Sequence, residues 1–334
     1  MMILVTGGTG YIGSHVCALL LAAGREVAIV DNLSNSGADV VDRLETVTGR
    51  RPLFHRGDVR DAGFLTEVAA KLRPECALHF AGLKAVAESV RQPLAYYDVN
   101  VGGTATLLKV LQQNGTRRFV FSSSATVYAP SEVMPLTEES PLGPYNPYGW
   151  TKFMAEQILR DLAAAAPDWR VAVLRYFNPV GAHESGLLGE KPLGTPNNLM
   201  PRLCDAAAGR TPRFSVFGLD YPTRDGSGVR DYLHVTDLAL GHIRAMEHLE
   251  TAAGAHVYNL GTGTGLSVLE MAAAFRAATG VEAPYEVCPR RPGDLAEYYS
   301  SPAKAERELG WKAEKTPADM CRDAWAFHRR CLAD

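Results

Sequence analysis

The first half of the chain alternates short, unbroken apolar runs with longer segments of helical periodicity. The apolar runs predict β-strands at Ile3–Thr6, Glu26–Val30, Leu53–Arg56, Cys76–Phe80, Arg118–Ser122 and Val171–Tyr176. Helices are predicted between them at Ile12–Ala23, with Gly24 as the C-cap, at Leu94–Gln113 and at Tyr148–Ala166. Strands without polar alternation are typical of parallel sheets that are covered on both faces. The pattern therefore predicts an α/β fold built on a doubly wound parallel sheet.

The pattern changes after residue 177, where glycine and proline become frequent. Shorter elements follow, at Asn198–Ala208, Phe214–Phe217, Thr236–His248, Val268–Thr279, Pro302–Leu309 and Pro317–Arg330. We therefore expect two domains, residues 1–177 and a smaller α/β domain of residues 178–334, with the segment near 235–262 packing back on the first domain. The second domain is expected to cover the carboxyl edge of the sheet, where open α/β proteins bind their ligands.

Composition and charge exclude several classes of protein. Lysine and arginine number 34 against 37 acidic residues, so the net charge of -3 argues against a nucleic-acid binder and a polybasic membrane patch. No apolar run is long enough to cross a bilayer, and the N-terminus lacks the basic segment of a signal peptide. The six cysteines are scattered and form no CxxC pair. We therefore expect a cytoplasmic protein with free thiols and no metal site.

A glycine-rich turn follows the first predicted strand and opens the first predicted helix. Its glycines at positions 7, 10 and 13 suit a tight turn whose backbone approaches a pyrophosphate at a helix N-terminus. Asp31 ends the next strand, where a carboxylate can accept hydrogen bonds from ribose hydroxyls and would repel a 2′-phosphate. The pattern predicts a Rossmann-like first domain that binds NAD in preference to NADP. The alternative is a glycine-rich turn with an unrelated surface aspartate.

A serine, a tyrosine and a lysine form a second candidate constellation. Ser124 follows the end of a predicted central strand, and Tyr148 and Lys152 are four residues apart on one helix face. A nearby ammonium and a positively charged nicotinamide would both lower the pKa of a tyrosine from its usual value near 10. Together the three side chains suit proton transfer on a secondary alcohol during hydride transfer. A Tyr-x-x-x-Lys pair on its own is more often a solvated helix face.

The chain resembles the UDP-glucose 4-epimerase family, part of the extended short-chain dehydrogenase/reductases. The segments that carry the resemblance are TGGTGYIGSH, HFAGLKAVAES, FSSSATVYA, YNPYGWTK, LRYFNPVGAH, NNLMP, GVRDYLHV, YNLGTG and PRRPGDLAEYY. The resemblance implies reversible interconversion of UDP-glucose and UDP-galactose. In that reaction Tyr148 takes a proton from the sugar 4′-hydroxyl while hydride passes to NAD. The 4-keto sugar then turns its other face and is reduced again.

The same resemblance implies which residues bind the cofactor and the sugar nucleotide. The implied cofactor residues are Gly7, Gly10, Tyr11, Ile12, Gly13, Asp31, Asn32, Leu33, Ser34, Asn35, Ser36, Asp58, Val59, Phe80, Ala81, Gly82, Lys84, Ser124, Tyr148, Lys152 and Phe177. The implied substrate residues are Lys84, Ser124, Tyr148, Asn178, Asn198, Leu199, Phe217, Arg230, Arg291, Asp294 and Tyr298. The chain departs from the family pattern at Val99, which replaces a cofactor-contacting asparagine, and at Ala129, which replaces a frequent glycine.

Several residues have expected roles outside the catalytic site. Arg290 is expected to form a surface ion pair, and His183, His234 and His242 are expected to be structural. The tryptophans are expected in the core or in an interface. The resemblance also implies a homodimer that pairs the helices beginning near Leu94 and Tyr148. Candidate contact residues are Leu107, Leu108, Leu111, Ile158 and Leu162, unless these side chains simply cover the sheet.

Three other functions remain as alternatives. A nucleotide-sugar 4,6-dehydratase typically has an Asp-Glu pair after its catalytic serine or threonine, but Ser124 is followed by Ala-Thr-Val. A UDP-glucuronate decarboxylase shares the core but not the FAGLKAV and NPVGAH segments. A non-catalytic NAD(H)-binding sensor of this fold would usually have lost the tyrosine or the lysine, and this chain has both.

Overall fold

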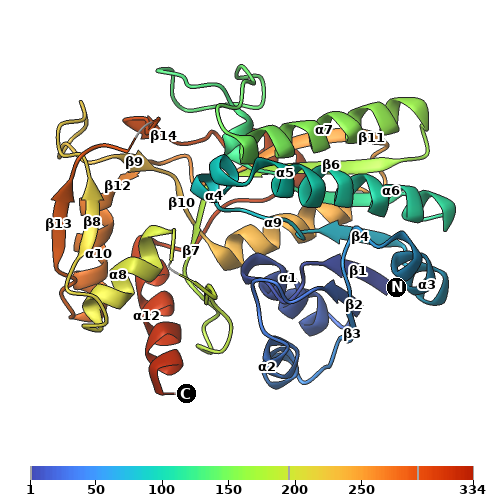
Figure 1. The fold of residues 1–334 in the computed structure, drawn as a ribbon, viewed down its shortest axis with the longest axis horizontal. Helices are drawn as coiled ribbons and strands as arrows, with labels where there is room; N and C mark the ends of the chain where they lie inside the picture. The colour runs from blue at the N-terminus through green and yellow to red at the C-terminus, as the bar shows by residue number, and fades with distance from the viewer. Residues whose placement is uncertain (1, 195, 292, 334) are drawn as a thin grey trace.

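A seven-stranded parallel sheet forms the centre of the larger lobe (Figure 1). The computed structural model describes residues 2–194, 196–291 and 293–333. The strand order is β3-β2-β1-β4-β5-β6-β11. The strands are β1 (Met2–Thr6), β2 (Glu26–Asp31), β3 (Leu53–Arg56), β4 (Cys76–His79), β5 (Arg118–Ser122), β6 (Arg170–Tyr176) and β11 (Gly254–Leu260). The predicted doubly wound parallel sheet is confirmed, and β1 and β4 mark the point where the strand order reverses.

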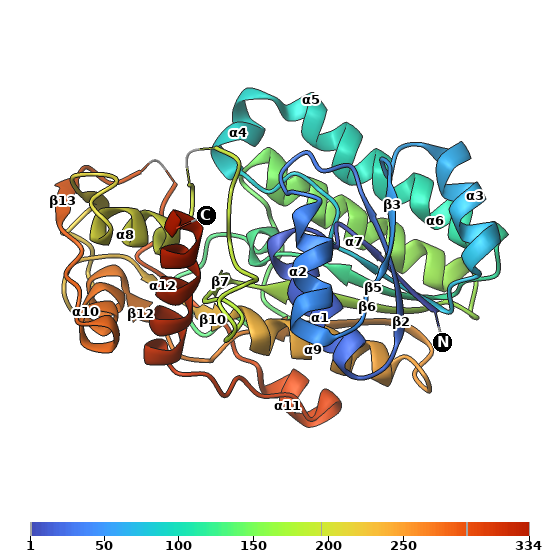
Figure 2. The same ribbon diagram turned by 90° about the horizontal axis from the view of Figure 1, so that it is seen from below.

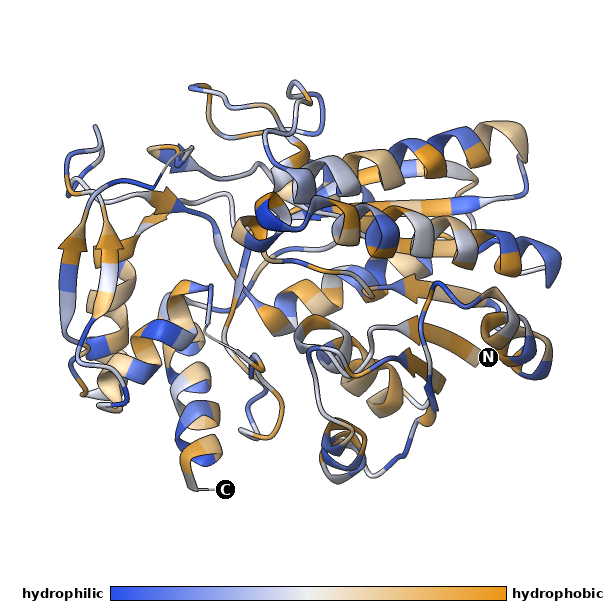
Figure 3. Ribbon diagram, in the orientation of Figure 1, coloured by the Kyte–Doolittle hydropathy of each residue, from blue (hydrophilic) through white to orange (hydrophobic). Residues whose placement is uncertain are grey.

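Helices cover both faces of this sheet (Figures 1 and 2). One layer contains α1 (Tyr11–Ala22), α2 (Asp39–Thr48), α9 (Val235–His248) and α11 (Ala303–Leu309), and the other contains α3 (Ala62–Leu72), α6 (Gly103–Gln113) and α7 (Pro147–Ala165). Successive strand residues enter opposite layers: Ile3 and Val5 join the core under α1 and α9, and Leu4 joins the core under α6 and α7. The strands are accordingly apolar along their length, as Figure 3 shows.

The long helix expected at 94–113 is divided into three parts. A short α5 (Pro93–Tyr96) leads into a π-helix (Tyr97–Gly102), which continues as α6. The Asn100 side chain accepts a hydrogen bond from the Leu83 backbone N–H at 2.8 Å and donates to the Leu83 carbonyl at 3.0 Å and to the Thr151 hydroxyl at 3.0 Å. These tertiary contacts are made from within the wider turn of the π-helix. The periodicity of the sequence does not reveal them.

The five apolar residues expected in a dimer interface lie against their own sheet. Leu107, Leu108 and Leu111 are buried in the core, and Ile158 and Leu162 pack partly buried against it. The three leucines of α6 therefore cover the sheet, and a dimer contact stays a prediction for the partly exposed Ile158 and Leu162. Exposed apolar side chains of the same region lie on α4 (Val86–Arg91), on α5 and on the outer face of α7.

The smaller lobe contains short strands and three longer helices (Figure 1). β8 (Phe214–Phe217) pairs in parallel with β13 (Tyr285–Cys288), and β9 (Val229–Arg230) lies between β12 (Leu266–Ser267) and β14 (Glu297–Tyr298). The helices are α8 (Leu199–Ala207), α10 (Val268–Thr279) and α12 (Pro317–Ala333). A capping box between Ser267 and Glu270 fixes the start of α10. Met271, Phe275 and Cys321 lie in the core between α10 and α12.

The two lobes are interleaved along the chain. β7 (Asn178–Val180) leaves the large lobe and pairs with β10 (Tyr232–His234), after which α9 packs beside α1 and β11 pairs with β6. The chain then returns to the smaller lobe through α10. The segment from Val235 to Leu260 thus lies after residue 178 in the chain but completes the larger lobe. The domain boundary at 177/178 stays a prediction.

Most predicted elements lie within one or two residues of the observed ones, with three kinds of exception. Gly24 is not the C-cap of α1, which is Ala23, but follows it with φ +77°. The helices α2, α3 and α4 were not predicted, nor were the strands β11 (Gly254–Leu260) and β13 (Tyr285–Cys288) and the two- and three-residue strands. All six cysteines are free thiols, as expected, and four of them are buried. No helix in the described ranges is long and apolar enough to span a membrane.

Candidate active site at the carboxyl edge of the sheet

The carboxyl ends of the parallel strands bring distant segments of the chain to one edge. β1 ends at Thr6, β2 at Asp31, β4 at His79 and β5 at Ser122. Parallel register places these ends side by side, with Thr6 opposite Val30 on one side and opposite His79 on the other. The glycine-rich turn, Asp31, the segment after β4 and the serine segment are therefore neighbours, as the sequence predicts.

The glycine-rich turn between β1 and α1 is packed too closely for side chains. Gly7 has φ +72°, and a Cβ there would lie 2.6 Å from the Ala81 backbone nitrogen. A Cβ on Gly13 would lie 2.3 Å from the Gly7 carbonyl oxygen. Gly10 is the N-cap of α1 and supplies no side-chain hydrogen bond to the helix. The first turn of α1 therefore presents backbone N–H groups without a capping side chain, which fits the pyrophosphate of a dinucleotide.

Asp31 lies beside this turn and is only 9% exposed. Its carboxylate accepts hydrogen bonds from the backbone N–H groups of Thr9, at 3.2 Å, and Leu33, at 2.9 Å. Leu33 adopts a left-handed conformation with φ +62°, which turns the chain at the end of β2. The carboxylate is thus held where it could accept hydrogen bonds from the ribose hydroxyls of a bound dinucleotide. The fit supports NAD at this edge.

The neighbouring cofactor residues form a connected polar rim. Asn32 donates to the Asp58 carboxylate at 2.9 Å, and the Thr9 and Ser36 hydroxyls are 2.6 Å apart. The Arg60 guanidinium beside Asp58 lowers the pKa of that carboxyl well below its usual range. Sequence analysis did not identify Arg60, which pairs with both Asp58 and Asp98. The remaining members of this predicted group are placed along the same rim, at Ser34 and Asn35 after β2 and at Val59 after β3.

The segment after β4 lies against the glycine-rich turn, on the side away from Asp31. A Cβ on Gly82 would lie 2.9 Å from the Asn100 side-chain oxygen, and Ala81 approaches Gly7 as described. The Phe80 and His242 rings are 4.8 Å apart. Val99, which replaces an asparagine of the family pattern, is half-buried in the π-helix. Asn100 beside it supports this segment through its two bonds to Leu83.

Tyr148, Lys152 and Ser124 come together where β5 and α7 meet. Tyr148 lies in the first turn of α7, which Asn146 caps by accepting the Gly149 N–H at 2.9 Å. Tyr148 is buried beside Ser124, whose side chain acts to lower the pKa of the phenol. Lys152 donates to the Ser122 carbonyl at 2.8 Å, and its ammonium lies 5.9 Å from the centre of the Tyr148 ring. The predicted acid–base constellation therefore exists as a buried cluster.

Burial dominates the electrostatics of this cluster. It raises the pKa of Tyr148 well above its usual value, although the hydrogen bond with Ser124 acts in the opposite direction. Burial also lowers the pKa of Lys152 to about 8, against the opposing effect of Glu156. The expected lowering of the tyrosine pKa is thus not a property of the protein alone. It requires additional positive charge, which an oxidised nicotinamide would bring.

A buried ion pair behind this cluster is a feature that sequence analysis missed. Arg175 on β6 donates twice to Glu156 on α7, at 3.0 and 2.7 Å, and both side chains are at most 1% exposed. Ser123 donates to the same carboxylate at 2.6 Å. The only signal in the sequence is that Glu156 follows Lys152 by one helical turn. The pair fixes the serine segment against α7, because a buried carboxylate needs all of these donors.

Four of the predicted substrate residues cluster in the smaller lobe. The Asp294 carboxylate accepts from Arg291 at 2.8 Å and from Arg230 at 3.4 Å. The Arg291 guanidinium stacks over the Phe217 ring at 4.8 Å. Two guanidinium groups and an aromatic face are an arrangement that suits a diphosphate and a flat base. Arg290, by contrast, forms the expected surface ion pair, with exposed Asp220 at 2.8 Å.

Tyr298 connects this cluster to the segment that follows Ser124. It is the register partner of Arg230 in the β9–β14 pair, and its hydroxyl donates to the Ala125 carbonyl at 2.7 Å. Its ring lies 5.4 Å from the ring of Phe177. The residue after Ser124 is therefore in direct contact with the smaller lobe. Ala125, Thr126 and Val127 form a short 3-10 helix there, so no carboxylate follows the serine.

The remaining predicted substrate residues lie where the chain runs from the larger lobe to the smaller lobe. Asn178 begins β7, Asn198 is the N-cap of α8, and Leu199 begins that helix. Asn198 donates to the Glu190 carboxylate at 2.7 Å, and Lys84 donates to the same oxygen at 2.7 Å. Glu190 was not identified from the sequence, where it lies between two motifs without a pattern of its own.

The three histidines noted in the sequence have structural partners. His234 lies 3.3 Å from Asp323, His242 contacts the Leu238 carbonyl at 2.9 Å, and the His183 ring is 2.9 Å from the Ser185 hydroxyl. Burial lowers the pKa of His242 to about 4, so it is neutral at pH 7. Among the described residues, no group of three metal-ligating side chains is present.

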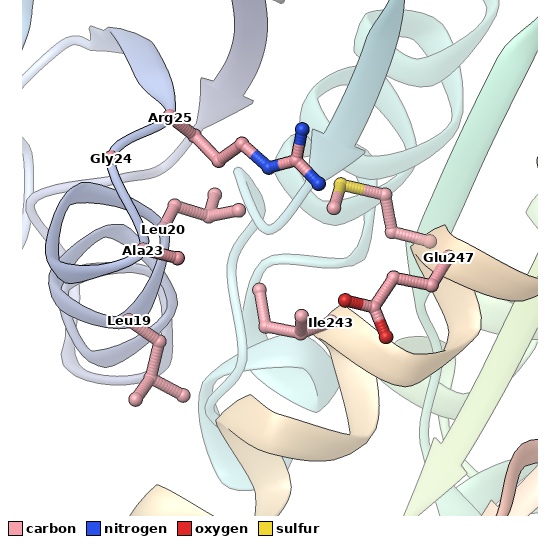
Figure 4. A pocket seen from close by; sticks show the side chains of 8 residues that line it. Leu19, Leu20, Ala23, Gly24, Arg25, Ile243 and Glu247 are labelled. Carbon is pink, nitrogen blue, oxygen red and sulfur yellow. The ribbon is translucent and has the colours of Figure 1, made fainter.

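A cavity of about 260 Å³ lies away from this edge, between α1 and α9 (Figure 4). Leu19 and Leu20 of α1 face Ile243 and Glu247 of α9 across it, with Arg25 at the start of β2. It therefore adjoins the amino ends of the strands, opposite the edge where parallel sheets bind ligands. We assign the active site to the carboxyl edge, because the chemistry-bearing side chains lie there.

Comparison with known proteins shows sequence and fold similarity along nearly the whole chain. The model of the NAD dependent epimerase/dehydratase family matches residues 3–261. A UDP-glucose 4-epimerase of Bacillus subtilis (strain 168) is 54% identical over 327 residues, covering 98% of this chain and 96% of that protein. The crystal structure of UDP-glucose 4-epimerase from Stenotrophomonas maltophila, with bound NAD and formylated UDP-arabinopyranose, is similar with a TM-score of 0.98 and 48% identity, covering 100% and 99%. The Bifidobacterium longum enzyme, in complex with NAD+ and UDP, has a TM-score of 0.95 and 49% identity, covering 99% and 98%.

Proposed function

This chain belongs to the NAD dependent epimerase/dehydratase family, and on that basis we propose that it interconverts UDP-glucose and UDP-galactose with NAD as cofactor. The observation that carries the proposal is the buried cluster of Ser124, Tyr148 and Lys152, in which the Lys152 ammonium lies 5.9 Å from the centre of the Tyr148 ring. This cluster adjoins the glycine-rich turn on one side and the smaller lobe on the other. The similar proteins named above, UDP-glucose 4-epimerases at 48–54% identity, support the same substrate class.

The chain's own residues hold and move one proton in the proposed reaction. NAD, when bound, accepts a hydride from the sugar C4 and later returns it. Gly7, Gly10, Gly13 and Asp31 would hold its pyrophosphate and ribose. Tyr148 accepts the proton of the 4′-hydroxyl and returns it after the sugar has turned, while Ser124 orients the same oxygen. Lys152 supplies positive charge that favours the tyrosinate.

The proposal is tested by incubating the purified protein with UDP-galactose and measuring UDP-glucose by chromatography. Interconversion in both directions is the expected result, with no net consumption of NAD, because the hydride is returned within each cycle. Absence of interconversion in protein shown to contain NAD would refute the proposal. Formation of a 4-keto-6-deoxy sugar would favour a dehydratase instead. Loss of carbon dioxide from UDP-glucuronate would favour a decarboxylase.

Protein purified without added nucleotide is expected to contain NAD(H) and little NADP(H). Asp31 is nearly buried and negatively charged where a 2′-phosphate would lie, and the catalytic cycle never requires the cofactor to exchange. Denaturing the protein and measuring the released dinucleotides by chromatography checks this result. Recovery of mainly NADP(H) would show that Asp31 does not select the cofactor.

Tyr298 is expected to restrict the enzyme to sugars without an N-acetyl group. Its phenol is fixed by the hydrogen bond to Ala125 and by contact with Phe177, so it does not turn aside freely. Overfilling a packed pocket costs about 1–3 kcal/mol, or roughly tenfold to two-hundredfold in kcat/KM. Tyr298→Cys should therefore gain activity on UDP-N-acetylgalactosamine relative to UDP-galactose.

The Tyr298 prediction is checked by comparing kcat/KM for the two sugars in both proteins. Tyr299→Cys is the matched control, because Tyr299 packs near Gly265 instead. Equal use of both sugars by the wild type, or no relative gain in Tyr298→Cys, would contradict the steric role.

We also propose that two copies associate through the outer surface of α4, α5 and α7. Exposed apolar side chains gather there, at Val86, Val90, Leu94, Trp150 and Met154, with exposures from 39% to 82%. These helices lie beside one another along one face of the large lobe (Figures 1 and 2). A surface of this kind suits a twofold contact between helix pairs.

The assembly is tested by light scattering at micromolar concentration. The wild type is expected to have the mass of a dimer, and Leu94→Glu, which places a charge at the most exposed of these residues, should shift it toward the monomer. Leu193→Glu is the matched control, since Leu193 is 64% exposed and lies on no helix. A monomeric wild type would count against the dimer.

A further inference from the structure

One carboxylate joins the segment after β4 to the smaller lobe. The Glu190 Oε1 atom accepts hydrogen bonds from the Lys84 ammonium and from the Asn198 side-chain amide, each at 2.7 Å. Lys84 belongs to the segment after β4, next to the glycine-rich turn, and Asn198 caps α8 of the smaller lobe. The Glu190 side chain is only 11% exposed, so its charge is largely shielded from solvent.

The segment that carries Glu190 is attached to the cofactor side at several points. The Tyr11 hydroxyl donates to the Gly181 carbonyl at 2.7 Å, and Arg43 of α2 donates to the Leu187 carbonyl at 3.3 Å. Residues 181–190 thus connect α1, α2 and the segment after β4 before the chain enters the smaller lobe. Glu190 lies at the end of this segment and beside the small cavity lined by Tyr11 and Gly181.

We propose that Glu190 is a positioning residue that couples Lys84, beside the predicted cofactor site, to Asn198, a predicted nucleotide-sugar residue. The inference rests on the proposed function, because the family resemblance implies that Asn198 binds the nucleotide sugar of that reaction. Glu190 does not itself bind the diphosphate, since two negative groups in one site repel each other. Its carboxylate neutralises Lys84 and fixes the Asn198 amide, so that a UDP group meets donors that are already oriented.

The charge and the acceptor oxygen of Glu190 are separable. Glu190→Ala removes both, and the Lys84 and Asn198 side chains lose their common acceptor. Glu190→Gln retains one acceptor oxygen and removes the negative charge. The glutamine variant should therefore lie between the wild type and the alanine variant in every property that depends on orientation.

The test measures UDP binding to the NAD-containing protein by isothermal titration calorimetry, together with kcat and KM for UDP-galactose. Glu190→Ala should weaken UDP binding about tenfold, because hydrogen bonds that involve charged groups contribute on this scale. KM should rise by a similar factor while kcat changes less than about threefold. Glu190→Gln should recover part of the affinity, to within about threefold of the wild type.

Glu184→Ala is the matched control, because Glu184 is an exposed carboxylate on the same segment. It should leave UDP binding unchanged, and the thermal unfolding midpoints of all variants should be compared to confirm that they fold. Unchanged or tighter UDP binding in Glu190→Ala, or a glutamine variant no better than the alanine variant, would overturn the inference. A wild type that binds UDP but does not convert UDP-galactose would refute only the proposed function, since the calorimetric comparison requires no turnover.

Discussion

Replacing Tyr148 with phenylalanine is expected to lower kcat for UDP-galactose by at least about a hundredfold, the lower range for loss of a general acid–base group. The ring would keep its packing, including the edge-on contact with Tyr96 at 6.5 Å between ring centres. Only the hydroxyl that contacts Ser124 is removed. Binding of UDP should therefore change little while proton transfer is lost.

The Tyr148→Phe result is checked by steady-state kinetics and by measuring the bound NAD. Tyr258→Phe is the control, because it removes a phenol hydroxyl from a buried tyrosine of β11 outside the proposed site. The control should keep nearly normal turnover. Near-normal turnover in Tyr148→Phe would show that another group accepts the proton.

Replacing Lys152 with methionine is expected to lower turnover at neutral pH by about a hundredfold or more. Methionine has a similar length and no charge, so Tyr148 loses a cation that lies 5.9 Å from its ring centre and favours the ionised phenol. Burial already raises the pKa of Tyr148, and removing a nearby positive charge is expected to raise it further. A smaller fraction of the enzyme would then hold the tyrosinate at pH 7.

The sign of the pH dependence follows from the same charges. In Lys152→Met the acidic limb of the kcat profile should move to higher pH, because a tyrosine without its cation ionises later. Part of the lost turnover should therefore return as the pH is raised toward 10. Lys109→Met, on the exposed face of α6, controls for the loss of one positive charge. An unshifted profile in Lys152→Met would show that Lys152 acts only through packing.

The lowered pKa of Lys152 predicts a second feature of the wild-type pH profile, on its basic limb. Burial lowers this pKa to about 8, so the ammonium is mostly charged at pH 7 and is progressively lost at higher pH. The wild-type profile should accordingly decline where Lys152 deprotonates, whereas Lys152→Met has no such decline. Comparing the basic limbs of the two profiles therefore separates the lysine from the tyrosine.

Local patterns in the chain determined most of the larger lobe. Unbroken apolar strands require cover on both faces, so β1, β2, β4, β5 and β6 were predictable as a parallel sheet. The same topology places the ends of those strands at one edge, which explains why the glycine-rich turn, Asp31 and Ser124 were predicted as one site. Tyr148 and Lys152 were predictable because four residues make about one helical turn.

Features that depend on distant contacts were not predictable in this way. The π-helix at Tyr97–Gly102 accompanies the bonds of Asn100 to Leu83 and Thr151, which no local pattern records. The leucines of α6 were equally compatible with a dimer contact and with the sheet, and only packing showed that they cover the sheet. Strands of two or three residues, such as β9 and β14, have too few positions to show a period.

The sequence by itself therefore determined six of the seven strands of the sheet and the glycine-rich turn, and it predicted Ser124, Tyr148 and Lys152 as the catalytic side chains. The tertiary structure alone decided the state of those side chains and their neighbours. Burial, which raises the pKa of Tyr148 and lowers that of Lys152, is a property of the folded surroundings. The contact of Glu156 with Arg175, and that of Glu190 with Lys84 and Asn198, join residues between 8 and 106 positions apart. Such contacts arise from how the two lobes and the sheet are assembled, because charges and hydrogen bonds act through space.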